Sequence, residues 1–273
     1  RNRVAGRLDL TDEAVMCRSL HDERGGTQPF GVYLLDPSDE RTELGRILER
    51  SVLFEFFENT EAMLDEEYRP YDDASRFIVL VDHERARVAG AVRLIHGGTA
   101  CGLKSIRDAC RPDSWNLTPE DFLSEDPLLD GRSATTWDIA TLGVRAPYRG
   151  EPHNSFYSAS MLHATYWWSL LAGVRAWVAI IDEAVLDLLH SVSVPLKPVC
   201  GQPPLEYLGS SRSFVCFLLI DEFRLLLRER AESPVEGLVL NGAGFHDVVS
   251  FPDIVLTAVQ DASRTDSEAT SGP

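Results

Sequence analysis

Strand-like and helical runs alternate along most of this chain, and that alternation limits the folds open to it. Strands are predicted at 30–36, 76–82, 87–97, 135–146, 175–181, 204–209 and 213–220. Helices are predicted at 10–20, 40–59, 154–174, 182–192 and 221–230. The order β-α-β-β-β-α-β-α-β-β predicts a mixed α/β (α+β) domain built around one central sheet.

The composition of the segments predicts the organisation of the chain. An N-terminal extension is expected at 1–29, and the main domain at 30–230. Within that domain, residues 98–135 are rich in Gly, Pro, Asp and Ser, which predicts a long insertion or a lid. A C-terminal extension is expected at 231–260, followed by a low-complexity tail at 261–273 that we expect to be disordered.

Charge and composition exclude several classes of function. The chain has 273 residues, and its 44% hydrophobic content is enough for a sizeable core. Twenty-six Lys and Arg against 43 Asp and Glu leave a formal charge of −17, which disfavours nucleic acid and anionic membrane surfaces as partners. No apolar run reaches the roughly 18 residues that span a bilayer. Five scattered cysteines without a CxxC pair, and no visible signal peptide, predict a cytoplasmic protein with free thiols.

Motifs of several common chemistries are absent from the sequence. The seven histidines show no HExxH or other metal spacing, so no metal is expected. There is no GxSxG elbow, no GxGxxG loop and no GxxxxGK[ST] loop. A metal enzyme, a serine hydrolase and a nucleotide hydrolase are therefore disfavoured.

The stretch TLGVRAPYRG, residues 141–150, changes from a strand pattern to a loop and then leads into a long helix. Such a turn holds a phosphate well, because unpaired backbone N–H groups and the positive end of the helix dipole meet there. Arg145 and Arg149 add positive charge on an acidic protein. The alternative is an ordinary strand-turn-helix connection with two solvated arginines.

Val144, Pro147, Arg149 and Gly150 resemble the start of the acyl-CoA loop of the GCN5-related N-acetyltransferase (GNAT) superfamily. The resemblance implies a sheet whose fourth and fifth strands splay apart, with acyl-CoA or acyl-phosphopantetheine as co-substrate. It places the donor at Leu142, Gly143, Val144, Arg145, Arg149, Gly150, Asn154 and Ser155. Where the family continues with Gly or Ala, this chain has Glu151 and Pro152, so either the pyrophosphate is held differently or the donor arrives on an acyl carrier protein.

Further motifs resemble the acyl-homoserine-lactone synthases and the N-acyl amino acid synthases. Gly90, Arg93 and Leu94 match a G-x-x-R-L strand, and Trp137 and Val144 match a W-E-x-S-R-F-x-V strand in which Asp138 replaces the Glu. Thr141 stands at the Arg position of that strand, which argues against lactone formation. The resemblance implies that the acceptor is bound by Glu67, Asp72, Asp73, Arg93, Trp137 and Thr141.

The resemblance also implies roles in the chemistry of acyl transfer. A backbone N–H near Leu142 or Gly143 would face the thioester carbonyl, and Gly143 would mark either a bulge that opens the strands or a packing gap. Asp138 is the first candidate for the base, and Tyr207 for the acid beside the departing sulfur. Arg93, among apolar neighbours, should meet Asp72, Asp138 or an acceptor carboxylate.

These observations predict an N-acyltransferase that moves an acyl group from a thioester to the amine of a small molecule or an amino acid. An acyl carrier protein is a possible partner of the reaction. The main alternative is a catalytically degenerate member of the fold that binds an acyl thioester or a protein without chemistry. A third option is another thioester reaction, such as decarboxylation.

Overall fold

The computed structural model describes residues 10–24, 26–57, 59–149, 154–191, 194–229, 239–240, 242, 244–245, 247–253 and 255–259. The tail predicted at 261–273 lies outside these residues, and so do the first nine residues of the predicted N-terminal extension.

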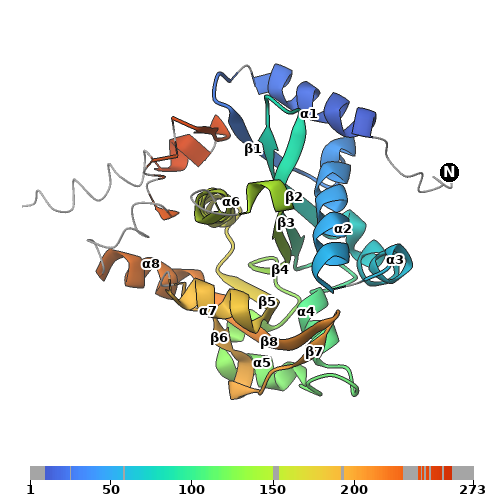
Figure 1. The fold of residues 1–273 in the computed structure, drawn as a ribbon. Coiled ribbons are helices and arrows are strands. Elements are labelled where there is room, and N and C mark those ends of the chain that lie inside the picture. Colours follow the sequence, from blue (N-terminus) through green and yellow to red (C-terminus); the bar gives the residue numbers. More distant parts are fainter. Residues whose placement is uncertain are drawn as a thin grey trace, which may run out of the picture.

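The described strands form one mixed sheet, which confirms the predicted fold class (Figure 1). They are β1 (Phe30–Leu35), β2 (Ser75–Asp82), β3 (Arg87–His96), β4 (Thr136–Val144), β5 (Ala176–Asp182), β6 (Lys197–Pro198), β7 (Leu205–Tyr207), β8 (Ser210–Leu219) and β9 (Val249–Ser250). Their order is β6-β8-β5-β4-β3-β2-β1-β9, with β7 paired to β8. The pairs β4–β5 and β1–β9 are parallel, and the other pairs are antiparallel.

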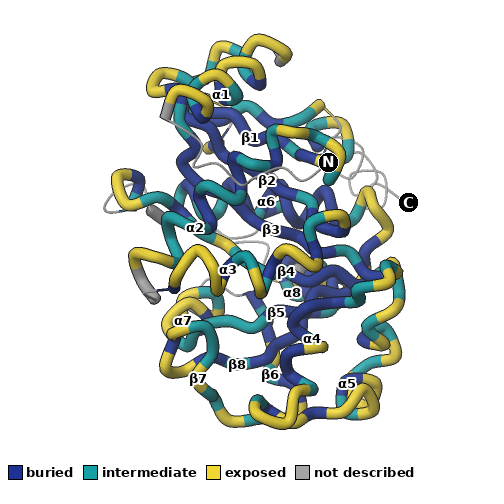
Figure 2. The backbone as a smooth tube through the Cα atoms, turned by 90° about the vertical axis from the view of Figure 1, so that its right-hand side faces the viewer, coloured by how far each residue is buried: buried dark blue, intermediate teal, exposed yellow. Residues whose placement is uncertain are grey.

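Helices cover both faces of the sheet (Figure 1). They are α1 (Leu10–Arg24), α2 (Glu43–Phe57), α3 (Glu61–Tyr68), α4 (Lys104–Ala109), α5 (Pro119–Glu125), α6 (Asn154–Leu171), α7 (Glu183–Ser191) and α8 (Ile220–Glu229). The helix α2 packs Leu44 and Leu48 against Phe77 of β2, together with Cys17 and Leu20 of α1. The apolar helix α6 lies across the opposite face, so the strands between these layers are buried (Figure 2).

The segment predicted as a long insertion or lid is ordered and packed. It forms α4, α5 and short 3-10 turns, and its Leu103, Trp115 and Phe122 join a separate core cluster with side chains of β5 and β8. The indole Nε1 of Trp115 donates a hydrogen bond to the carbonyl of Pro203 at 3.0 Å. Residues 98–135 therefore support one end of the sheet.

The described residues after α8 belong to the main core. The strand β9 extends the sheet beside β1, and Phe245 and Phe251 pack with α6. His163 Nδ1 lies 2.6 Å from the carbonyl oxygen of Val239, and Trp167 Nε1 donates to the carbonyl of Leu240 at 2.9 Å. These contacts hold the described residues between 239 and 259 against the helix that covers the sheet.

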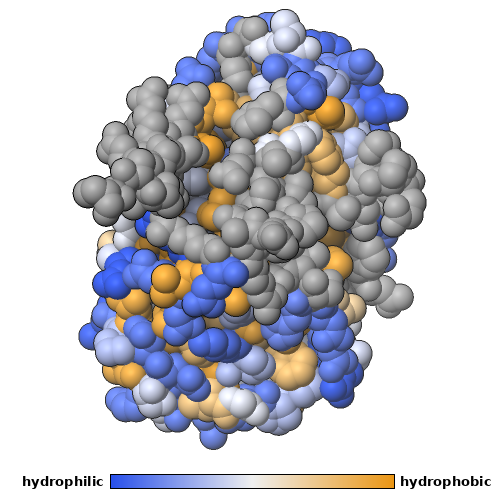
Figure 3. Space-filling view, turned by 90° about the vertical axis from the view of Figure 1, so that its left-hand side faces the viewer, coloured by the Kyte–Doolittle hydropathy of each residue, from blue (hydrophilic) through white to orange (hydrophobic). Residues whose placement is uncertain are grey.

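The surface alternates between charged and apolar areas. On the side that carries α6 and α8, hydrophobic residues are exposed between hydrophilic ones (Figure 3). None of the helices within the described ranges is long and apolar enough to cross a membrane. Within the same ranges, no three or more His, Cys, Asp and Glu side chains come together as a possible metal site.

Candidate active site

The strands β4 and β5 part after a short parallel contact. Their register covers Thr136–Ala176, Trp137–Trp177 and Asp138–Val178, whereas β4 continues to Val144 and β5 continues to Asp182. On its other edge, β4 stays paired with β3 as far as Val144. The splay that the resemblance predicts is therefore present, and it begins directly after Asp138.

A cavity of about 540 Å³ occupies the gap between the parted strands. Its walls include Ile139–Gly143 of β4 and Ala179–Asp182 of β5. Helix α2 contributes further lining from one face of the sheet, and α6 and α7 contribute it from the other. Most of the lining is apolar, and polar groups gather where Glu49, Tyr68, Thr141 and Tyr207 meet.

A β-bulge changes which way the residues of β4 face. The register with β3 shifts at Ala140, since Leu94 pairs with Ile139 and Arg93 with Thr141. Residues opposite each other in an antiparallel pair share a face, so Asp138 and Thr141 both face the α2 side despite their odd spacing. The bulge is thus at Ala140 and not at Gly143, which was one of the two interpretations of that glycine.

The glycine at 143 makes room for helix α2. A Cβ atom there would lie 2.9 Å from Cγ2 of Val52, closer than side chains normally approach. Because β4 runs this near to α2, the wall of the cavity at Gly143 is bare backbone. Gly143 therefore marks a close approach of β4 to α2, which is neither the bulge nor the packing gap considered for this glycine.

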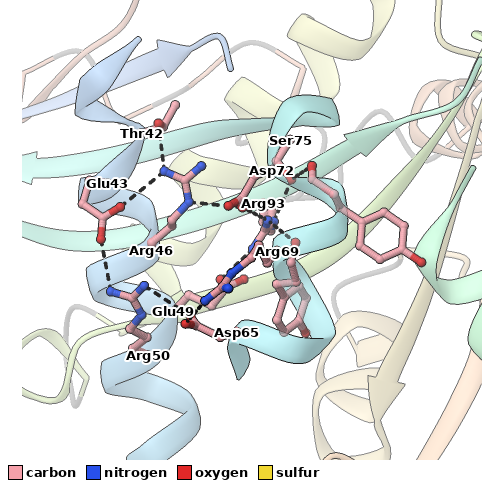
Figure 4. A network of polar contacts seen from close by, with 12 residues as sticks. Thr42, Glu43, Arg46, Glu49, Arg50, Asp65, Arg69, Asp72, Ser75 and Arg93 are labelled. Atoms are coloured by element: carbon pink, nitrogen blue, oxygen red, sulfur yellow. Dashed lines mark hydrogen bonds and ion pairs between the residues drawn. The ribbon is translucent and has the colours of Figure 1, made fainter. Parts of the chain in front are cut away.

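Arg93 lies at the centre of a buried polar network beside the cavity (Figure 4). Its side chain is 1% exposed. Its N–H groups donate to Ser75 Oγ at 2.8 Å, Glu49 Oε2 at 2.9 Å, Asp72 Oδ1 at 2.8 Å and the carbonyl of Tyr68 at 3.1 Å. The prediction that Arg93 meets Asp72 is confirmed. With four bonds to protein atoms, Arg93 positions other residues, and the prediction that it binds the acceptor is not supported.

Glu49 is the polar side chain of this site that the sequence analysis missed. It is 7% exposed and lines the cavity from α2. Its Oε1 accepts a hydrogen bond from Thr141 Oγ1 at 2.8 Å, while Oε2 accepts one from Arg93. A signal was available, because Glu49 lies three residues before Val52, on the side of the helix that faces the sheet.

The acidic stretch before β2 forms a helix and supplies this network. Thr60 caps α3 by accepting a hydrogen bond from the backbone N–H of Met63. Asp72 is shared by Arg93 and Arg46, whose Nε lies 3.3 Å from Asp72 Oδ1 (Figure 4). Asp73 is exposed. Asp72 thus holds Arg93 in place, and the predicted contact of this stretch with an acceptor stays a prediction.

A second buried network holds Tyr207 against the cavity. Lys104 Nζ donates to Glu67 Oε2 at 2.8 Å, to Tyr207 Oη at 2.7 Å and to Asp108. The Tyr207 hydroxyl in turn donates to Asp108 Oδ2 at 2.6 Å. Burial, with Tyr68 and the Asp108 carboxylate nearby, raises the pKa of Tyr207 well above 10. Tyr207 therefore keeps its proton at neutral pH and meets the cavity as a phenol, while Glu67 is occupied by Lys104.

Asp138 lies beneath α4 and does not reach the cavity. It is fully buried and does not belong to the cavity lining. Its oxygens accept the backbone N–H of Ser105 at 2.6 Å and the hydroxyl of Ser105 at 2.8 Å. Burial raises the pKa of Asp138 to about 6, although these hydrogen bonds act in the opposite direction. The prediction that Asp138 is the base is not supported, because its oxygens are used to hold α4 on β4.

Trp137 is also a buried residue of the core. It is 2% exposed and packs edge to face on Trp168 of α6, with ring centroids 5.7 Å apart. Val144 belongs to the same core. Neither side chain lines the cavity, so the predicted contact of Trp137 with an acceptor is not supported.

The residues predicted to hold phosphate are only partly described. Arg145 pairs with Glu13 of α1 at 3.0 Å. Arg149 pairs with Glu55 of α2 at 3.1 Å and bonds to the carbonyl of Val144. Gly150 and the side chains of Asn154 and Ser155 lie outside the described residues. Leu142 and Gly143 do line the cavity, and the phosphate subsite remains a prediction.

Comparison with protein-family models and with curated proteins gives no match. Among solved structures, the chain is similar to FeeM, an N-acyl amino acid synthase from uncultured soil microbes, with a TM-score of 0.52 and 14% identity over 73% of this chain and 96% of FeeM. The acyl-homoserine-lactone synthase LasI has a TM-score of 0.46 and 16% identity, over 71% of this chain and 91% of LasI. The CoA-dependent acyl-homoserine-lactone synthase BjaI has a TM-score of 0.47 and 15% identity, over 85% of this chain and 98% of BjaI. The likeness to FeeM confirms the predicted resemblance at the level of the fold.

Proposed function

We propose that this protein is an N-acyltransferase that moves an acyl group directly from a thioester to the amine of a small molecule or an amino acid. One observation carries the proposal: β4 leaves β5 after three residue pairs, and a cavity of about 540 Å³ fills the gap. The fold is shared with a solved structure that is named as an N-acyl amino acid synthase.

The gap suits a thioester donor, either acyl-CoA or an acyl carrier protein. The backbone of β4 from Ile139 to Gly143 faces the cavity where a neighbouring strand would otherwise lie, so its polar groups can bond to the amides of a pantetheine arm. In this arrangement the backbone N–H of Leu142 or Gly143 binds the oxygen of the reacting carbonyl, and the position of both residues in the cavity wall supports that role. The apolar walls beyond, formed by α6 and α7, suit the acyl chain.

Glu49 and Tyr207 divide the proton transfers between them. The acceptor amine loses a proton to Glu49, and its nitrogen attacks the thioester carbonyl carbon, so that the C–N bond forms. The tetrahedral oxyanion accepts a hydrogen bond from the β4 backbone, and the C–S bond then breaks. The departing thiolate takes the proton of Tyr207, and solvent returns the proton held by Glu49 to the phenolate. Lys104, 2.7 Å from the phenol oxygen, stabilises the charge on Tyr207 in between.

The experiment is an incubation of the protein with a panel of acyl thioesters and amines, in which free thiol and amide product are measured. CoA esters and esters of a loaded acyl carrier protein form separate arms. Thiol release that depends on the amine, with amide formed in equal amount, supports transfer. A donor at a hundred times its Kd should add about 2.7 kcal/mol to the free energy of unfolding.

Two other outcomes have distinct meanings. Stabilisation by a donor without thiol release would favour a binding module, for which the commitment of Arg145 and Arg149 to protein carboxylates is a supporting observation. A shortened acyl thioester would indicate decarboxylation. If no thioester changes the melting temperature and none releases thiol, both the enzyme and the binding module are rejected.

A further inference from the structure

The polar end of the cavity is acidic on the side that an acceptor would meet. Among the described residues that line the cavity, the carboxylates are Glu49 and Asp182, and there is no Lys, Arg or His. Asp182 caps α7, since its Oδ1 accepts the backbone N–H of Ala184 at 2.8 Å, and its Oδ2 accepts the Ser210 hydroxyl. Glu49 is therefore the carboxylate that stands beside Thr141 and the proposed reaction centre.

The nearest ammonium group has no donor left for a ligand. Lys104 carries three N–H bonds, and its three partners are Glu67, Asp108 and Tyr207. Its side chain is 3% exposed. A substrate carboxylate would have to displace one of these partners, and two of the three are themselves carboxylates. The positive charge of Lys104 is thus balanced by two carboxylates, and Lys104 does not give the cavity a binding site for an anion.

The guanidinium of Arg93 does not line the cavity, and four of its five N–H groups are bound to protein atoms. Four bonds of Arg93 go to Ser75, Glu49, Asp72 and the carbonyl of Tyr68, and two of these partners are carboxylates. Arg46 adds one positive charge at Asp72, but it also pairs with Glu43. Arg50 and Arg69 complete this network, whose four arginines are matched by four carboxylates, Glu43, Glu49, Asp65 and Asp72, so it offers no surplus cation to a substrate carboxylate.

We propose that the acceptor is a primary amine without a carboxylate beside its nitrogen, and not an amino acid. The inference rests on the proposed function and names the substrate class of the same site. The ammonium of such an amine is attracted to Glu49, and after one proton has passed to solvent, the neutral amine gives a second proton to Glu49 as its nitrogen attacks. An α-carboxylate would be held within a few ångströms of Glu49 with no cation to receive it, and like charges this close are strongly disfavoured away from water.

The test compares amines with the amino acids from which they differ by a carboxylate: phenethylamine with phenylalanine, tyramine with tyrosine, and putrescine with ornithine. With one acyl thioester held constant, kcat/KM for amide formation should favour each amine by about 100-fold. The amides of the same amino acids separate charge from size. If charge decides, phenylalanine amide is accepted nearly as well as phenethylamine, and phenylalanine is not.

A variant tests the reason for the discrimination. Asp72→Asn removes a carboxylate and leaves one N–H of Arg93 with a weaker partner, so the preference for amine over amino acid should narrow by about tenfold. Asp182→Asn is the matched control at the other carboxylate of the lining, and it should leave the ratio unchanged. If Asp72→Asn does not fold, the comparison of substrates in the unmodified protein still decides.

The outcomes separate this inference from the proposed function. Amide formation that is equal or faster with the amino acids would overturn the inference and leave the acyltransferase in place. A preference for amines that is shared by the amino acid amides supports it. An absence of amide and of thiol release with every amine and amino acid would reject the proposed function, and the inference with it.

Discussion

The Thr141 hydroxyl donates a hydrogen bond to Glu49 Oε1 at 2.8 Å, and this bond fastens α2 to β4 where β4 has already left β5. The other oxygen of Glu49 is held by Arg93. Because both of its oxygens are hydrogen-bonded, the Glu49 carboxylate keeps one orientation. Binding of a substrate amine would therefore not cost the conformational entropy of ordering this side chain. The bond links the helix layer to the site at which acyl transfer is proposed.

Glu49→Gln should lower kcat by about 100- to 1000-fold, because the amide cannot take a proton from the amine. Donor binding should be unchanged, since the donor lies along β4, and thermal shift with the acyl thioester measures that. Glu43→Gln, on the same helix but outside the cavity lining, is the matched control and should keep its turnover. An unaltered kcat in Glu49→Gln would remove Glu49 from the chemistry.

Tyr207→Phe should lower kcat with CoA thioesters by about tenfold or more, because the leaving thiolate loses its proton donor. The defect should shrink with thiophenyl esters, whose thiolate leaves without protonation. Steady-state kinetics with the two donor types, in the unmodified protein and in the variant, gives the comparison. An equal loss with both donors would indicate that Tyr207 only shapes the cavity.

Asp138→Asn should become more stable relative to the unmodified protein as the pH rises. The folded pKa of Asp138 is about 6, above its ordinary value of 3.8, so the folded state holds this proton more tightly than the unfolded state does. Its contribution to the free energy of unfolding is present below about pH 4 and is lost as the pH rises to about 6. Relative to the variant, the unmodified protein should lose about 2 kcal/mol between pH 4 and pH 7.

Chemical denaturation of both proteins across that pH range measures the difference. A difference that stays constant with pH would show that Asp138 titrates normally. Turnover of Asp138→Asn at neutral pH supplies a second readout. It should be largely retained, whereas a large loss of kcat with intact donor binding would return Asp138 to the role of base.

Gly143→Ala should destabilise the fold by about 1–2 kcal/mol, because the added methyl meets Val52 at 2.9 Å and pushes β4 from α2. Val52→Ala in the same chain removes the obstructing atoms, so the double variant should be more stable than the sum of the two single changes predicts. Urea denaturation of the four proteins completes the cycle. Simple additivity would mean that β4 and α2 do not press on each other here.

The sequence was enough to predict the strands β1–β5, β7 and β8, the hairpin of β2 and β3, and helices α2 and α6, most of which carry a clear apolar pattern, whereas the two-residue strands β6 and β9 were missed. The splay followed from the resemblance of residues 137–150 and is present. Helix α3 was missed, because its stretch is dominated by acidic residues and its apolar contacts are limited to Leu64 and Tyr68. The short helices of the segment 98–135 were not predicted, because they pack through scattered apolar residues that have no periodic pattern.

The candidate site was harder to predict than the fold. The bulge at Ala140 breaks the alternation of β4, and no feature of the sequence marks its place. Asp138 was preferred as the base because it stands in a matching strand motif, but α4 covers it through Ser105. Glu49 was not considered, although its partner Arg93 had been recognised as a buried cation that needed a carboxylate. The role of each of these carboxylates depends on hydrogen bonds to residues that are distant in the sequence, and the sequence alone does not show which residues pair.

The sheet has two halves, one containing β1–β4 and the other β5–β8, and only three residue pairs between β4 and β5 join them. That seam is the narrowest crossing among the long strands, so backbone amides there should exchange with deuterium sooner than those of the β2–β3 ladder. A molecule bound between the two halves would contact both and hold them in a fixed relative position. Its binding should therefore reduce the flexibility of the whole sheet, including strands that the molecule does not contact.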